Sequence, residues 1–98
     1  MASTFASLPR EVLDRAGQRA PFDAERIRTA LQRAGEATGE YGADEAQLLT
    51  AQVTKVLIHR FHGDAPTIEQ IQGVAEQTLI AANHLATARA YIVYREQP

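Results

Sequence analysis

The chain of 98 residues has no cysteine and no tryptophan, and its only serines are Ser3 and Ser7. The absence of cysteine excludes disulfides, thiolate zinc sites, iron–sulfur ligands and thiol nucleophiles. No stretch approaches the roughly 20 apolar residues that cross a bilayer, and the start of the chain lacks the positive charge and apolar run of a secretory signal. We therefore expect a cytoplasmic protein with no membrane partner and little basis for nucleophilic catalysis.

An excess of positive charge is also lacking, because 10 basic residues stand against 12 acidic ones and give a formal net charge of −2. Binding of duplex nucleic acid by counterion release requires a basic face, so we expect no nucleic-acid partner. Apolar residues make up 45% of the chain and charged residues 22%, an ordinary globular balance. A chain of this length forms one small domain that buries roughly 65% of its unfolded surface, too little for a deep enclosed catalytic cleft.

Motifs for catalysis or metal binding are weak. His59 and His62 are three residues apart on a predicted helix, but no third ligand stands at a suitable spacing, so we expect no metal site. Carboxylate pairs such as Glu36 and Glu40 are more typical of a solvated surface than of an acid–base pair. The sequence has neither Gly-x-Gly-x-x-Gly nor a Walker loop. We therefore expect that this chain by itself is not an enzyme.

The N-terminal part predicts a loose lead-in over residues 1–9, followed by one domain over residues 10–98. Two short extended runs, 11–15 and 18–22, lie on either side of an Ala-Gly turn and predict a β-hairpin. Pro21 cannot donate to a strand ladder, so we expect it near a strand end.

Apolar stripes at i, i+3, i+4 and i+7 predict two helices in the first two thirds of the chain. The first begins at an Asp23 N-cap and ends near Gly35 and Gly39. The second begins at an Asp44 N-cap, with Gln47 completing a capping box, and stops before Pro66. The expected buried residues are Ile27, Ala30, Leu31 and Ala34 on the first helix and Leu49, Val53, Val56, Leu57 and Phe61 on the second.

Two more helices are predicted in the last third. Thr67 and Gln70 have the spacing of a capping box, and Asn83 or His84 can cap a last helix over residues 85–96. The expected inward residues are Ile71, Val74, Ala75, Thr78 and Leu79, then Leu85, Ala88, Ile92 and either Tyr91 or Val93. Short helix connections favour a bundle, so the predicted fold is mainly α (α+β), a four-helix bundle capped by a small N-terminal hairpin.

Arginine supplies all but one of the basic residues, the exception being Lys55. The arginines gather from the hairpin into the first helix and again on the last helix. They are typical either of a solvated bundle surface or of bidentate recognition of phosphate or carboxylate groups.

Four segments, in order, resemble the ATP-cone family. They are Val12-x-x-Arg15-x-Gly17; Pro21-Phe22-Asp23-x-x-Arg26-Ile27 with Ala34-Gly35; Pro66-Thr67-Ile68-Glu69-x-Ile71-Gln72; and Ala88-Arg89-Ala90-Tyr91-Ile92-Val93-Tyr94-Arg95. The resemblance spans about residues 11–96. It implies a helical bundle under a hairpin lid, with ATP or dATP beneath the lid and Mg²⁺ accompanying the nucleotide.

The resemblance also implies a regulatory role. ATP-cones are allosteric modules, mostly at the N-terminus of ribonucleotide reductases and also in the bacterial repressor of reductase genes. In reductases, ATP keeps the enzyme active and dATP turns it off, generally through quaternary structure. The expected partners are thus an adenine nucleotide and either a catalytic reductase domain or another ATP-cone.

Applied position by position, the resemblance implies that Val12 and Ile27 pack on adenine and that Arg15, Arg26 and Arg95 bind phosphate. The full set of expected nucleotide-binding residues is Val12, Arg15, Phe22, Asp23, Arg26, Ile27, Phe61, Thr67, Gln72, Tyr91 and Arg95. One departure is Asp14, which stands where the family usually has a phosphate-contacting lysine. A second interpretation therefore stays open, a degenerate cone that acts as a protein–protein interaction bundle with weak or no nucleotide binding.

Overall fold

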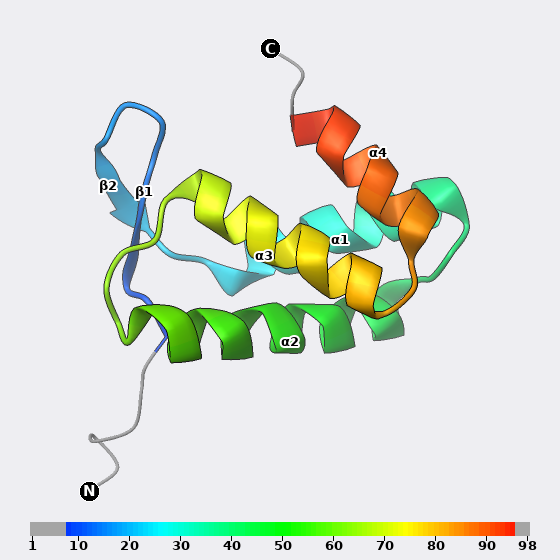
Figure 1. Cartoon of the computed structure of the whole chain (residues 1–98), viewed down its shortest axis with the longest axis horizontal. Helices are drawn as coiled ribbons and strands as arrows, with labels where there is room; N and C mark the ends of the chain where they lie inside the picture. The colour runs from blue at the N-terminus through cyan, green and yellow to red at the C-terminus, as the bar shows by residue number, and fades with distance from the viewer. Residues whose placement is uncertain (1–7, 96–98) are drawn as a thin grey trace, which may run out of the picture.

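The computed structural model describes residues 8–95, which form two short strands followed by four helices (Figure 1). Strands β1 (Glu11–Leu13) and β2 (Arg19–Pro21) pair antiparallel, with Glu11 opposite Pro21. The predicted hairpin is therefore confirmed with shorter strands, and Pro21 lies at the end of the ladder. Most of the predicted lead-in lies outside the described residues.

The hairpin turn is held by the side chain of Asp14. Its Oδ1 atom accepts the backbone N–H groups of Ala16 and Gln18, each at 2.9 Å, and Gly17 adopts a φ of 81°. The hairpin is also tied to the helices, because the N–H of Leu13 donates to the carbonyl of Pro66 at 2.9 Å. As a result the hairpin covers the end of the bundle where α3 begins (Figure 1).

The helices are α1 (Ala24–Thr38), α2 (Ala43–Phe61), α3 (Ile68–Ala81) and α4 (Leu85–Arg95). Each helix packs on the next, and α1 also packs on α4, which closes the bundle. The five residues predicted to face inward on α3 are its buried residues. The predicted fold, a mainly helical bundle with a small sheet, is confirmed. No helix in the described part of the chain is long and apolar enough to cross a membrane.

Two of the three predicted side-chain caps on the first three helices are confirmed. Asp23 caps α1, and Thr67 and Gln70 form the capping box of α3. The prediction for α2 is wrong, since this helix follows Gly42 and has no side-chain cap. Asp44 lies inside its first turn, where its negative charge interacts favourably with the positive end of the helix dipole without acting as a cap.

The end of α1 depends on a close approach between Gly35 and Tyr41. Gly39 is the left-handed C-cap, as predicted, but Gly35 lies inside the helix rather than at its end. The ring of Tyr41 packs directly over Gly35, where a Cβ atom would overlap the ring carbons. The Tyr41 hydroxyl donates to the Leu31 carbonyl at 2.6 Å, which fixes the ring in this position.

The first turn of α4 corrects two predictions. Its backbone N–H groups at Ala86 and Thr87 donate to the carboxylate of Glu40, at 3.2 and 2.8 Å, so the side-chain acceptor comes from the loop before α2 rather than from Asn83 or His84. Thr87 is fully buried, and Leu85, two residues or about 200° away on the helix, is consequently 55% exposed. Leu85 was expected to face inward.

Tyr91 rather than Val93 faces inward on α4. Val93 is 57% exposed, whereas Ala88 and Tyr91 are buried. This arrangement places Tyr91 at the boundary between α4 and α1, where the candidate site lies.

Candidate functional site

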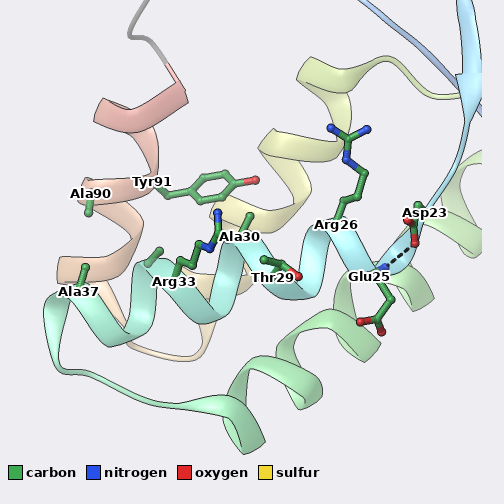
Figure 2. Close-up of a pocket in the computed structure, with 10 residues that line it drawn as sticks. Asp23, Glu25, Arg26, Thr29, Ala30, Arg33, Ala37, Ala90 and Tyr91 are labelled. Carbon is green, nitrogen blue, oxygen red and sulfur yellow. Dashed lines mark hydrogen bonds between the residues drawn. The ribbon is translucent and has the colours of Figure 1, made fainter.

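A groove of about 780 Å³ lies between α1 and α4 (Figure 2). Its volume falls within the range of about 300–1,000 Å³ that is usual for small-molecule sites. The small side chains of the groove belong to Ala30, Ala34, Ala37 and Ala90. Its larger residues are Asp23, Glu25, Arg26, Thr29, Arg33 and Tyr91.

The groove exists because α1 presents alanine and arginine on one face. Arg26, Ala30, Arg33 and Ala37 follow each other at i, i+4, i+7 and i+11, so they lie along one side of the helix. Ala30, which was expected to be buried, is only half-buried, and it leaves open space instead of filling the contact with α4. Tyr91 extends from α4 into this space, with its hydroxyl pointing toward Arg26 (Figure 2).

Three of the residues expected to bind nucleotide meet in this groove, namely Asp23, Arg26 and Tyr91. Arg33 also lines the groove but was missed by the sequence reasoning. Its position seven residues after Arg26 was the available signal, since that spacing returns to the same helix face.

The positive charge in the groove belongs to Arg26 and Arg33, whose guanidinium groups are not paired with a carboxylate of the described residues. Among the described side chains, neither Arg26 nor Arg33 takes part in an ion pair or a side-chain hydrogen bond. Arg28, on another face of the same helix, instead binds Glu25 at 2.9 Å and Gln32 at 2.7 Å. Unpaired guanidinium groups beside a groove are suited to bidentate binding of phosphate or carboxylate.

The apolar residues of the expected set lie in or against the core. Ile27 is a member of the core and is 9% exposed, while Val12, Phe22 and Phe61 are partly buried and pack on it. None of these four lines the groove. The aliphatic surface expected to contact adenine is thus largely in contact with the protein itself.

The remaining expected residues lie mostly near the hairpin. Arg15 forms an ion pair with Glu69 at 3.4 Å, and Thr67 uses its hydroxyl to accept the N–H of Gln70 at 3.0 Å. Gln72 is half-buried on α3. Arg95 is the last residue of α4, and its side chain lies outside the described ones.

A polar cluster fixes α4 against the loop between α1 and α2. The Thr87 hydroxyl bonds the carboxylate of Glu40 and lies 2.7 Å from the hydroxyl of Thr38, and the bond from Thr87 lowers the pKa of Glu40. Next to it, the His84 ring packs at a tilt against the Tyr41 ring, with centroids 4.7 Å apart, and His84 bonds Glu45 at 2.9 Å. These contacts hold the start of α4, and with it the α4 wall of the groove, at a set distance from α1.

Metal ligands do not gather in the part of the chain that the structure describes: no group of three or more His, Asp or Glu side chains could hold a metal ion there. Mg²⁺ usually keeps several waters and binds through one or two carboxylates together with phosphate groups, so it does not depend on a cluster of this kind.

The comparison with known proteins agrees with the fold. The family model described as "ATP cone domain" matches residues 10–98. The chain therefore belongs to the ATP-cone family, a family of regulatory domains.

Ribonucleotide reductases are among the similar proteins. The chain is 33% identical over 94 residues to the ribonucleoside-diphosphate reductase subunit alpha of Chlamydia muridarum, a match covering 87% of this chain and 9% of that protein. It is 36% identical over 84 residues to the anaerobic ribonucleoside-triphosphate reductases of Salmonella typhimurium and Escherichia coli, with 86% of this chain and 11% of each relative covered. The chain thus spans about a tenth of the length of these reductases.

Proposed function

We propose that this chain is an allosteric domain that binds ATP or dATP and regulates a ribonucleotide reductase, either as one of its domains or as a partner. The observation that carries the proposal is the meeting of uncommitted Arg26 and Arg33 with Tyr91 in one groove of an ATP-cone. A flat apolar floor with a few convergent cations is what a nucleotide requires of its site.

In this proposal the phosphates lie toward the hairpin end of the groove. Arg26 stands in the first turn of α1, where the helix dipole also favours an anion. Arg15 from the hairpin and Arg95 from the end of α4 supply further guanidinium groups, and Thr67 and Gln72 contribute polar contacts from α3. Val12, Phe22, Ile27 and Phe61 do not line the groove, so in this proposal the purine reaches them only at the edge of the groove, through the surface that the core leaves exposed.

The nucleotide acts by differential binding. A ligand shifts an equilibrium between two arrangements only by the difference in its affinity for them. α4 forms one wall of the groove and the hairpin directly precedes the N-terminal end of α1, so a nucleotide that reaches both stabilises one spacing of the two. A catalytic reductase domain or a second cone would then recognise that arrangement.

The direct test is the melting temperature of the chain with ATP and with dATP. A ligand at 100 times its dissociation constant stabilises the folded state by about 2.7 kcal/mol. For a domain of this size that corresponds to a rise of roughly 10–20 °C. Arg26→Ala should abolish most of the rise, whereas Arg28→Ala, which removes an arginine outside the groove, should leave it largely intact.

The second candidate function is a protein-binding bundle without nucleotide. The observation in its favour is a set of exposed apolar residues that a partner could cover: Leu48, Ile80, Leu85 and Val93. No change in melting temperature at millimolar ATP and dATP would support this function and overturn the proposal above.

A further inference from the structure

The hairpin arginine expected to bind phosphate already faces a carboxylate of the protein. The Nε atom of Arg15 lies 3.4 Å from Oε2 of Glu69, and the two side chains are 61% and 60% exposed. We propose that Glu69 is an internal competitor of the nucleotide, which holds Arg15 in the free protein and is displaced by phosphate. This inference rests on the proposed function and names a residue that sets the affinity of that site.

The backbone brings the two groups together independently of any ligand. The Leu13 N–H bonds the carbonyl of Pro66, and Leu13 also forms a parallel bridge with Thr67, the N-cap of α3. The hairpin turn is therefore fixed beside the first turn of α3, where Glu69 stands. A carboxylate is favoured at that position by the positive end of the helix dipole.

The exposure of the pair makes the exchange possible. A buried ion pair that lost one partner would leave a desolvated charge, and its disruption would be expensive. Here the released Glu69 is already more than half exposed and enters solvent without that penalty. A phosphate oxygen offers the same guanidinium group a more strongly charged partner in a charge-assisted hydrogen bond.

Glu69 opposes the ligand in two ways. It occupies the guanidinium group, and its negative charge repels a polyphosphate that approaches the hairpin. An exposed ion pair changes an equilibrium constant by about five-fold or less, so the effect on affinity is modest. Because both contributions are Coulombic and solvent-exposed, they weaken as the ionic strength rises.

The chain provides a matched control. Arg19 and Glu11 form the other ion pair of the hairpin, at 3.2 Å, with side chains that are 63% and 47% exposed. Arg19 is not among the residues expected to bind nucleotide. Glu11→Gln therefore removes one negative charge from the hairpin while leaving the Arg15–Glu69 ion pair in place.

The experiment is isothermal titration calorimetry, in which AMP, ADP and ATP are each titrated into the chain. It is done first at low salt and then at roughly 0.5 M salt, where the Debye length is only a few ångströms. Glu69→Gln should tighten ATP binding by about two- to five-fold, with a smaller gain for AMP, and the gain should shrink at high salt. Glu11→Gln should change the affinity by less. In an Arg15→Ala background, Glu69→Gln should give at most the smaller gain that comes from charge repulsion alone. Melting curves without ligand show that each variant is folded.

The outcomes separate the two proposals. If the wild-type chain binds none of the three nucleotides, the proposed function fails and takes this inference with it. If the wild type binds ATP and Glu69→Gln leaves the affinity unchanged or weakens it, the competitor role alone is wrong, and weakening would mean that Glu69 positions Arg15 for the ligand. If Glu69→Gln and Glu11→Gln raised the affinity for ATP equally, the effect would come from net charge alone, and the inference would be overturned.

Discussion

The contact between Gly35 and Tyr41 predicts opposite effects for two glycine-to-alanine substitutions in this bundle. Gly35 on α1 lies directly under the Tyr41 ring, and a Cβ atom at residue 35 would overlap three of the ring carbons. Apart from its own helix backbone and chain neighbours, Gly73 on α3 has no atom of the described residues within 4 Å of the place where its Cβ would lie. Both glycines are inside helices, so the difference between the two variants isolates the packing contact.

The magnitude for Gly73→Ala follows from helix propensity. Alanine is more favourable than glycine in a helix interior by about 0.8–1.0 kcal/mol, and nothing opposes the new methyl group. We therefore expect a gain of about 0.5–1 kcal/mol in the free energy of unfolding. For a domain of this size the gain raises the melting temperature by roughly 2–8 °C.

Gly35→Ala has the same propensity gain but a larger opposing cost. Forcing an extra carbon into a packed site costs typically about 1–3 kcal/mol. Tyr41 can yield only by breaking the hydrogen bond from its hydroxyl to the Leu31 carbonyl, which costs about 0.5–1.5 kcal/mol more. The net expectation is a loss of about 1–3 kcal/mol.

Urea unfolding followed by circular dichroism measures both changes. Tyr41→Ala provides the decisive background, because without the ring Gly35→Ala should become neutral or stabilising. The two substitutions should therefore show a coupling of about 1–3 kcal/mol in a double-mutant cycle. If Gly35→Ala stabilises the wild-type chain as much as Gly73→Ala does, the close packing of Tyr41 on α1 is wrong.

Two further predictions concern pH. The hydrogen bond from Thr87 holds the pKa of Glu40 below its ordinary value of 4.5. The charged form therefore stabilises the fold above about pH 4.5, and this contribution is lost as the pH falls further. The urea midpoint of the Glu40→Gln variant should consequently depend less on pH below that value than the midpoint of the wild type. Burial raises the pKa of Tyr41 to about 12 from 10, so its contribution is complete below pH 10 and is lost as pH rises toward 12. Tyr41→Phe should flatten that alkaline loss, and an ultraviolet titration should show one late-titrating phenol fewer; a loss as steep as in the wild type would assign it to another group.

Local signals in the sequence were sufficient for most of the fold. The capping box of Thr67 and Gln70 and the apolar stripe of α3 depend on residues three or four apart, and both were predicted correctly. The start of α4 was not, because its cap is Glu40, 46 residues before Ala86. A contact at that separation leaves no periodic trace, and the buried Thr87 that turns Leu85 outward depends on the same contact.

The residues of the site were predicted less completely than the elements of the fold. Asp23, Arg26 and Tyr91 were all expected from the resemblance, and the structure brings all three to one groove. Ile27 was assigned both to the apolar stripe of α1 and to the adenine contact. The structure places it in the core with 9% exposure, so little of its side chain remains for a ligand. Arg33 went unnoticed because no motif contained it, although its spacing from Arg26 was sufficient.

Asp14 shows how the structure changes the meaning of a substitution. From the sequence alone, Asp14 is a negative charge near the proposed phosphate position, and Asp14→Lys is expected to strengthen binding. In the structure its carboxylate accepts the N–H groups of Ala16 and Gln18 and so builds the turn that presents Arg15. Asp14→Lys removes both bonds, and we expect it to destabilise the hairpin by about 1 kcal/mol and to weaken ATP binding. Asp14→Asn keeps an acceptor oxygen and removes only the charge, so this variant should bind ATP at least as well as the wild type. If Asp14→Lys bound ATP more tightly than Asp14→Asn, the charge at residue 14 would matter more for affinity than the hydrogen bonds of the turn.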